Sequence, residues 1–370
     1  MNETIRLTYL VDFFRTVQAG TETQLAHLLT HLPRTGYRIH LLSFQDSPFL
    51  QETAPKMFPE IAITTLGARA DMSKSLFSLW RLYRILRDTR PNMVHTFFHA
   101  ANSLGVMIAR VAGVRQVISS RRDMAFNITS RDLVLLRIAD RFVSCVICNA
   151  RAVRNKAMQS EGLREDKTRI IYNGIAVENY SPSDRICQET APVIGIVANL
   201  NREVKRVDLF IQAAAMVHQS HPRARFWVVG DGHLRAGLEK LARESGLQSA
   251  IQFWGRRADV PTLLKEMSIG VICSDSEGFS NAVMEYMAAG LAVITTDSGG
   301  AGEIIRHGQT GMLVAPGDAP GLVAAIRRML DEPDAAADLA RAGHAAVHKQ
   351  FSVERMLQET DTVYRNLMLS

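Results

Sequence analysis

Two glutamates, Glu277 and Glu285, are separated by seven residues, and their type and spacing suit the binding of a hydroxyl-bearing ligand. Glu277 lies in a polar loop after a buried apolar strand, and Glu285 lies in a helix predicted to begin near Ser280. A helix N-terminus that follows a strand offers N–H groups and the positive end of the helix dipole, which suit a phosphate. The flanking carboxylates are good acceptors for sugar hydroxyl protons. The pattern therefore predicts a sugar-nucleotide site.

This glutamate spacing resembles the signature of the family-4 retaining glycosyltransferases, which have the GT-B fold. The surrounding residues 276–318 are similar to that family's pattern over their whole length. Three shorter segments extend the resemblance: Gly230-Asp231-Gly232 after a strand, Phe253-Trp254-Gly255 at the strand end near the nucleotide base, and Ile171–Ile175, which closes the N-terminal domain. The match covers most of the C-terminal half and is far more specific than the glutamate spacing alone.

The resemblance implies a role for each residue of the donor site. Glu285 would bind the ribose hydroxyls, and Glu277 would contact the donor sugar. The turn glycines Gly230 and Gly255 would also belong to the donor site. The backbone N–H groups that would hold the β-phosphate are those of Phe279, Ser280 and Asn281.

In this family a basic pair holds the diphosphate. Lys205 matches the usual lysine, at the start of a helix predicted over Arg206–His218, whereas Asn199 occupies the usual arginine position. Arg202, one short loop away, is the candidate for the missing charge. The resemblance implies no metal, because Lys205 and the helix dipole replace an ion, although 275–277 has the spacing of a metal-binding DxD motif.

The N-terminal half supplies candidates for the diphosphate or acceptor side. Ala19-Gly20-Thr21-Glu22 resembles the family's Gly-Gly-x-Glu turn with Ala19 in place of the first glycine, so Gly20 and Thr21 are candidate loop residues. His99 follows one predicted strand and Arg122 the next, where either could contact the transferred sugar or the acceptor. The alternative for Arg122 and its neighbour Arg121 is a solvated basic face. His95, within a strand, is expected to be a core histidine bonded to a backbone group.

The elements that must position these residues alternate between strands and helices in two consecutive series. Such alternation predicts parallel sheets, in which ligands bind beyond the carboxyl ends of the strands. The first series contains predicted strands at Ile5–Val11, Tyr37–Phe44, Ile61–Leu66, Met93–Phe97, Gln116–Ser120, Phe142–Cys148 and Arg169–Tyr172. The second contains predicted strands at Val193–Val197, Arg225–Val229, Ile251–Phe253, Gly270–Ile272 and Ala292–Thr295.

The predicted fold class is α/β, with two Rossmann-like doubly wound domains. By resemblance this is a GT-B fold whose domains face each other across a cleft. Residues 1–178 form the acceptor-side domain and residues 190–350 the nucleotide-sugar donor domain. A linker is expected near 176–192, and helix 351–370 is expected to pack back on the N-terminal domain.

Composition excludes a disordered chain, a collagen and a small disulfide-rich protein, and the charge distribution suggests a partner. The 370 residues are 47% hydrophobic and 22% charged, as in soluble, well-packed proteins. The start has no signal-peptide pattern, and no apolar run reaches the ~18 residues of a membrane span, which predicts a cytoplasmic protein. Residues 1–180 carry a net charge of +9 against −3 for the rest. This asymmetry favours an anionic partner, and an anionic membrane surface would allow peripheral attachment at the inner face of the plasma membrane.

Two further patterns have ordinary structural interpretations. Cys145 and Cys148 form a CxxC within a buried strand, where their side chains point to opposite faces, so we expect buried thiols rather than a metal or redox site. A helix is predicted over Ser73–Thr89, and its apolar stripe is expected to be core. The stripe comprises Leu76, Leu79, Trp80, Tyr83 and Leu86. The excess of arginine on this segment stays unexplained by that interpretation.

Taken together, the residues and the resemblance predict a retaining, metal-independent glycosyltransferase of the hexosyltransferase type. It would use a UDP- or GDP-linked sugar as co-substrate, without a cofactor. The acceptor would be a glycan or a lipid-linked glycan of cell-surface polysaccharide or lipopolysaccharide synthesis. A sugar-nucleotide epimerase on the same fold and a non-catalytic sugar-nucleotide-binding subunit are the alternatives. No nucleic-acid partner is expected, because basic residues do not alternate with exposed aromatic ones in a known module.

Overall fold

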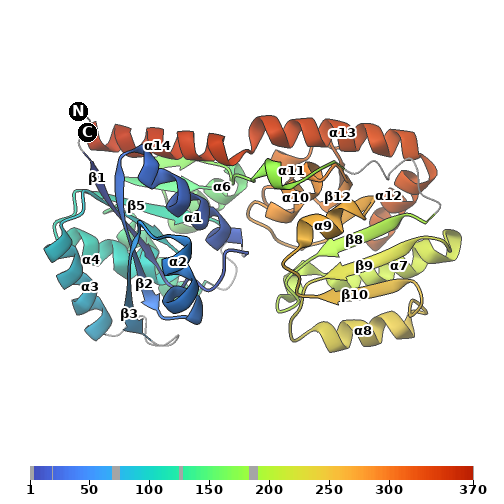
Figure 1. The fold of residues 1–370 in the computed structure, drawn as a ribbon, viewed down its shortest axis with the longest axis horizontal. Coiled ribbons are helices and arrows are strands. Elements are labelled where there is room, and N and C mark those ends of the chain that lie inside the picture. The colour runs from blue at the N-terminus through green and yellow to red at the C-terminus, as the bar shows by residue number, and fades with distance from the viewer. Residues whose placement is uncertain (1–3, 19, 69–75, 125–127, 183–190, 370) are drawn as a thin grey trace. The chain divides into compact units, whose positions relative to one another are not determined.

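The computed structural model describes residues 4–18, 20–68, 76–124, 128–182 and 191–369. The chain divides into two compact units, which are Met1–Gly174 together with Glu354–Ser370, and Ile175–Val353. Each unit is a parallel sheet with helices on both faces (Figure 1). The predicted linker lies partly outside the described residues.

The N-terminal unit contains a seven-stranded sheet of order β3-β2-β1-β4-β5-β6-β7, with every neighbouring pair parallel. The strands are β1 (Ile5–Val11), β2 (Tyr37–Gln45), β3 (Ala62–Ala68), β4 (Met93–Phe97), β5 (Gln116–Arg121), β6 (Cys145–Cys148) and β7 (Thr168–Ile170). The helices are α1 (Gly20–His31), α2 (Ala54–Met57), α3 (Leu76–Thr89), α4 (Val106–Val111), α5 (Ser130–Ala139), α6 (Arg151–Glu161) and α14 (Val353–Leu369). Because crossovers between parallel strands are right-handed, α3 to α6 lie on one face of the sheet and α1 and α2 on the other.

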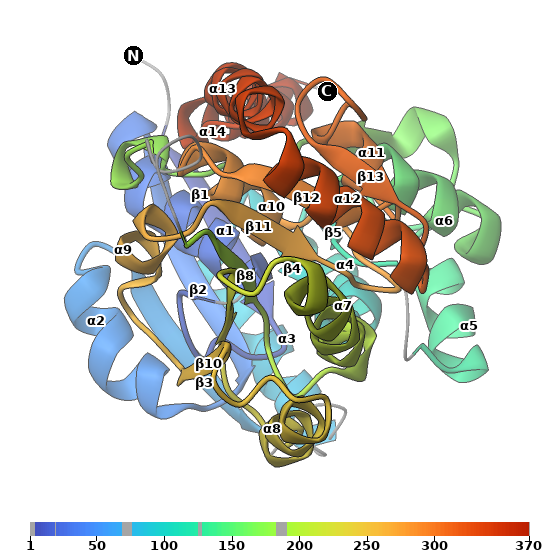
Figure 2. The same cartoon turned by 90° about the vertical axis from the view of Figure 1, so that its right-hand side faces the viewer.

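The C-terminal unit contains a six-stranded parallel sheet of order β10-β9-β8-β11-β12-β13. The strands are β8 (Val193–Val197), β9 (Arg225–Val229), β10 (Ile251–Gly255), β11 (Ile269–Ile272), β12 (Ala292–Thr296) and β13 (Met312–Val314). The helices are α7 (Val207–Ser220), α8 (Arg235–Glu244), α9 (Val260–Lys265), α10 (Asn281–Ala288), α11 (Ala301–Ile304), α12 (Ala319–Asp331) and α13 (Pro333–Gln350). Helix α7 packs beside α12 (Figure 2), and α10 packs beside α13.

Both sheets reverse their strand order at the first strand of the unit. Strand β1 lies between β2 and β4, and β8 lies between β9 and β11. In doubly wound sheets ligands bind at such a switch point, beyond the carboxyl ends of the strands. A ligand-binding site is therefore expected in the segments that follow β1, β4, β8 and β11.

The C-terminal helix α14 belongs to the N-terminal unit and completes its core. The Tyr364 hydroxyl lies 2.5 Å from His95 Nδ1 and 3.1 Å from the Tyr9 hydroxyl, and His95 Nε2 lies 2.8 Å from Ser120 Oγ. Burial lowers the pKa of His95 to about 3, so the ring is neutral. His95 is thus a core histidine as predicted, but its partners are side-chain hydroxyls rather than a backbone group.

The buried face of helix α3 differs from the one that the sequence predicts. Its buried face carries Leu82 and Leu86, whereas Leu76 and Trp80 of the predicted core stripe are exposed. Its predicted start at Ser73 lies outside the described residues. The prediction of buried thiols holds, because Cys145 and Cys148 are both buried and unpaired. Within the described part of the chain, no helix is both long and apolar enough to cross a bilayer.

Candidate functional site

The structure brings Lys205 and Glu277, two predicted catalytic residues, into direct contact. Lys205 lies in the short turn before α7, Glu277 lies in the loop after β11, and Lys205 Nζ forms an ion pair with Glu277 Oε1. The Ser274 hydroxyl donates a hydrogen bond to the same carboxylate oxygen at 2.7 Å. The two side chains are 19% and 15% exposed, so the pair is partly shielded from water yet accessible.

The loop that carries Glu277 rests directly on the segment after β12. Gly299 has a φ of +57°, and a Cβ atom there would lie 1.6 Å from the Glu277 carbonyl oxygen. The Gly300 N–H donates to the Gly278 carbonyl at 2.9 Å, and the Thr296 hydroxyl donates to the Ser274 carbonyl at 2.6 Å. Only glycine fits at position 299, and the loop is held where Glu277 can meet Lys205.

The predicted phosphate-binding residues lie at the start of α10, just beyond this loop. Ser280 precedes the helix with an extended backbone, and Asn281 is its first residue. The Phe279 side chain is buried, with its ring 5.3 Å from that of Phe351 at 65°. Phe279 therefore anchors the helix start, and only its backbone is suited to contact a phosphate.

Glu285 is a half-buried carboxyl on the second turn of α10. Burial raises its pKa to about 7, and its charge contributes to raising the pKa of Tyr180. Among the described residues, no hydrogen bond reaches the Glu285 carboxyl. A desolvated carboxyl without partners is suited to accept hydroxyl protons from a ligand. Tyr180 was not predicted as part of this site, because its segment has the composition of a linker.

Arg202 is exposed in the loop after β8, with its N–H bonded to the Asn199 carbonyl at 3.3 Å. Its side chain lines a cavity of about 670 Å³ between α7 and α8, whose described lining includes neither Lys205 nor Glu277. The role of Arg202 at the diphosphate stays a prediction. Arg206, which was not predicted, lies 3.1 Å from both Asp208 and Asp275.

The two predicted turn glycines are neighbours at the ends of β9 and β10. The Gly230 N–H donates to the Gly255 carbonyl at 2.9 Å, and both residues have positive φ. A Cβ atom at Gly230 would lie 1.8 Å from the Ala198 carbonyl oxygen. Gly230 is thus required for the close approach of this turn to the loop after β8.

In the N-terminal unit, Gly20 begins α1 and Thr21 follows it, while Ala19 lies outside the described residues. A Cβ atom at Gly20 would have no neighbour within 4 Å, so packing does not explain this glycine. Glu22 holds the preceding loop, because its carboxylate accepts the N–H groups of Arg15 at 2.5 Å and Thr16 at 3.3 Å. Glu22 is part of the turn motif in the sequence, but its role in holding the loop at Arg15 and Thr16 was not predicted.

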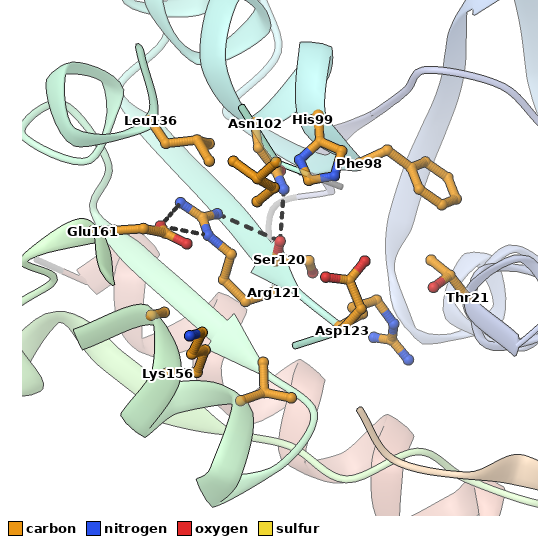
Figure 3. Close-up of a pocket in the computed structure, with 14 residues that line it drawn as sticks. Thr21, Phe98, His99, Asn102, Ser120, Arg121, Asp123, Leu136, Lys156 and Glu161 are labelled. Atoms are coloured by element: carbon orange, nitrogen blue, oxygen red, sulfur yellow. Dashed lines mark hydrogen bonds and ion pairs between the residues drawn. The ribbon is translucent and has the colours of Figure 1, made fainter. Parts of the chain in front are cut away.

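A small cavity of about 50 Å³ is lined by three predicted N-terminal residues, Thr21, His99 and Arg122. Figure 3 labels Thr21 and His99 on its wall. The Arg122 guanidinium donates to Asn173 Oδ1 at 2.5 Å and lies 5.9 Å from the centre of the Phe97 ring. Burial lowers its pKa to about 10. No described carboxylate pairs with Arg122, so its charge is available to a ligand in the cavity.

The adjacent Arg121 has a different role from Arg122. Its side chain is buried and forms ion pairs with Asp140 at 2.8 Å and Glu161 at 2.7 Å. It also donates to the Ser119 hydroxyl at 2.5 Å. The interpretation of Arg121 as part of a solvated basic face is therefore wrong, and this residue stabilises the wall of the cavity.

No cluster of three or more metal-ligating side chains occurs in the parts of the chain that the structure describes. Asp275, the first residue of the DxD-like triplet, forms an ion pair with Arg206. Glu277, the third residue, forms an ion pair with Lys205. The triplet is thus held by two cationic side chains.

Comparison with known families matches both halves of the chain to glycosyltransferases. Residues 191–332 match the family described as Glycosyl transferases group 1, and residues 19–179 match Glycosyltransferase Family 4. The lipopolysaccharide core biosynthesis glycosyltransferase LpsE of Rhizobium meliloti is 29% identical over 58% of this chain and 62% of its own length. The UDP-Gal:alpha-D-GlcNAc-diphosphoundecaprenol alpha-1,3-galactosyltransferase of Escherichia coli is 25% identical over 81% of this chain and 82% of its own.

Among solved structures, Anabaena Alr3699/HepE in complex with UDP resembles this chain with a TM-score of 0.85. The two are 21% identical, and the superposition covers 98% of this chain and 100% of the other. At this identity the likeness establishes the fold. It confirms the predicted GT-B class of two doubly wound α/β sheets.

Proposed function

The chain belongs to the family-4 glycosyltransferases of the GT-B fold, and from that premise we propose that it is a retaining glycosyltransferase. It would move a sugar from a nucleotide diphosphate sugar to an acceptor hydroxyl. The observation that carries this proposal is the Lys205–Glu277 ion pair beside the start of α10. This arrangement offers positive charge for a diphosphate and carboxylates for sugar hydroxyls at the carboxyl end of a parallel sheet.

Each residue of the donor site has a distinct task in this proposal. Glu285 accepts the ribose hydroxyls, and the N–H groups at the start of α10 receive the β-phosphate. Glu277 contacts the donor sugar, and Lys205 stabilises the charge that grows on the leaving diphosphate. The acceptor oxygen forms a bond to the anomeric carbon as the bond between that carbon and the phosphate oxygen breaks. The hydroxyl proton passes to a β-phosphate oxygen on the same face, which retains the configuration.

We propose a UDP-linked hexose as donor and a lipid-linked or polysaccharide glycan as acceptor. Support comes from relatives named for UDP-galactose, diphosphoundecaprenol and lipopolysaccharide core synthesis, and from the UDP complex of a protein with the same fold. Arg122, His99 and Thr21 are proposed to contact the acceptor or the transferred sugar. The enzyme would act in the cytoplasm, peripherally at the inner face of the membrane.

Catalysis is proposed to need no metal, because Lys205 and the helix end supply the positive charge. The test incubates the protein with candidate UDP- and GDP-sugars and a lipid-diphosphate-linked acceptor, with and without excess EDTA, and analyses the products. We expect an α-linked product from an α-linked UDP-sugar, at the same rate in EDTA. An epimerised nucleotide sugar, or nucleotide binding without any product, would refute transfer. Loss of activity in EDTA that magnesium or manganese restores would refute metal independence alone.

A further inference from the structure

Exposed apolar side chains are concentrated on one helical layer of the N-terminal unit. Of the ten large apolar side chains that are exposed among the described residues, seven lie on α3, α4, α5 or the turn after α5. They are Leu76, Phe77, Trp80, Val111, Val134, Ile138 and Phe142. Helices α3 and α4 lie side by side (Figure 1). Helices α3, α4 and α5 each belong to a crossover connection on the same face of the sheet. We call this surface the α3–α5 face.

Helix α3 carries the most exposed part of this face. At about 100° per residue, Leu76, Phe77, Trp80, Arg84 and Arg87 fall within one arc of roughly 100°. Leu76 is 85% exposed, Phe77 65% and Trp80 53%. The Phe77 and Trp80 rings stack with centroids 6.3 Å apart, and the Arg84 guanidinium lies 5.1 Å from the centre of the Trp80 ring. A contiguous apolar patch of this kind marks an interaction site.

The same face is strongly basic. The exposed arginines of α3 to α5 and of the short segments that follow these helices are Arg84, Arg87, Arg90, Arg115, Arg131, Arg137 and Arg141. Within the described residues of the three helices, Asp88 is the exposed carboxylate. This excess of exposed arginine over exposed carboxylate gives the face a positive potential that suits an anionic surface. Aromatic and leucine side chains beside arginines are the composition of helices that lie in the lipid headgroup region.

We infer that the α3–α5 face binds the surface of an anionic lipid bilayer. Leu76, Phe77 and Trp80 enter the boundary between headgroups and acyl chains, and the surrounding arginines contact anionic headgroups. This inference extends the proposed peripheral location and gives it a mechanism that net charge alone does not provide. Because apolar insertion is not screened by ions, raised salt should weaken the attachment without abolishing it.

The test is flotation of the full-length chain with vesicles of phosphatidylglycerol and phosphatidylethanolamine, or of phosphatidylcholine alone. We expect strong binding to the anionic vesicles and weak binding to the neutral ones. The double variant R84E/R87E should lower the partition coefficient by about tenfold or more, since each basic residue near the surface contributes on the order of one kcal/mol. F77S/W80S should also lower the partition coefficient, because it removes two inserted apolar side chains. The matched control is M216S, which replaces an exposed apolar residue of the other unit and should bind as the native chain does.

A second measurement reports where Trp80 goes. Lipids brominated near the headgroup should quench part of the native tryptophan fluorescence, and W80F should lose that part while still binding. UDP-induced thermal stabilisation should be the same in all variants, so failure of lipid binding is distinguishable from failure of the donor site. Native-like flotation of F77S/W80S, or unquenched Trp80, would overturn the inference. So would a native dimer that F77S/W80S converts to a monomer, because a second copy would then cover this face.

Discussion

Replacing Gly299 by alanine should disable the donor loop while leaving the fold largely intact. The backbone at Gly299 has a φ of +57°, which costs an L-residue about 1–2 kcal/mol. The new Cβ atom would also lie 1.6 Å from the Glu277 carbonyl oxygen. The carbonyl must therefore retreat by roughly 1.5 Å to reach a tolerable contact, and a 1 Å misplacement at a reacting site costs about 100-fold. We expect kcat to fall by about that factor or more, because Glu277 moves away from Lys205.

The control is Gly308→Ala, which imposes the same backbone penalty without a collision. Gly308 has a φ of +72°, and a Cβ atom there would have no neighbour within 4 Å. G308A should lower the melting temperature by a few degrees, as 1–2 kcal/mol does in a unit of this size, and G299A should lower it further, because displacing the Glu277 carbonyl adds to the backbone penalty. Initial rates of sugar transfer at saturating donor then separate them, and only G299A should be slow. If kcat of G299A were within about threefold of that of G308A, the assignment of the Glu277 loop would be refuted.

Three further perturbations test the site and its support. Lys205→Ala should lower kcat more than UDP affinity, because charge stabilisation grows in the transition state, and an equal loss in both would contradict this. UDP affinity, measured by calorimetry, should rise as pH increases through about 7, where Glu285 loses its proton, and this dependence should vanish in E285Q. Because the folded-state pKa of Glu285 is raised, its contribution to the free energy of unfolding is lost as pH rises from about 4.5 to about 7. In urea denaturation, E285Q should show a smaller decrease in the free energy of unfolding over that range. Arg121→Met should cost about 3–5 kcal/mol, since Asp140 and Glu161 lose their buried cation, and a cost below about 1 kcal/mol in urea denaturation would refute the triad.

Most of the fold was predictable, because strands buried on both faces are continuous apolar runs. The predicted bounds of β1, β4, β8 and β9 are those of the structure. Strand β13 was missed, because three residues at a sheet edge give too short a pattern. The predicted start of β6 was three residues early, since Phe142 and Val143 are apolar but precede the strand.

Other features needed the tertiary structure. Periodicity shows that α3 has an apolar stripe but not which part of it meets the sheet, so Trp80 was assigned to the core. Arg121 and Arg122 are identical in type and adjacent, yet Arg121 is the last residue of β5 and Arg122 follows the strand, so the two have different surroundings. Both line the cavity, but Arg121 is neutralised by Asp140 and Glu161, whereas Arg122 donates to Asn173. The contact between Lys205 and Glu277 joins residues far apart in the sequence, which local patterns do not reveal.

The position of α14 has a consequence for the order in which the protein folds during synthesis. The last strand of the N-terminal sheet, β7, ends at Ile170, but the Tyr364 hydroxyl that satisfies buried His95 and Tyr9 is translated after the whole C-terminal unit. At about 5–20 residues per second, the N-terminal sheet waits roughly 10–40 seconds for this side chain. The first unit to be made is thus the last to be completed, and a ribosome that stops before α14 releases a chain with buried polar groups lacking their partner.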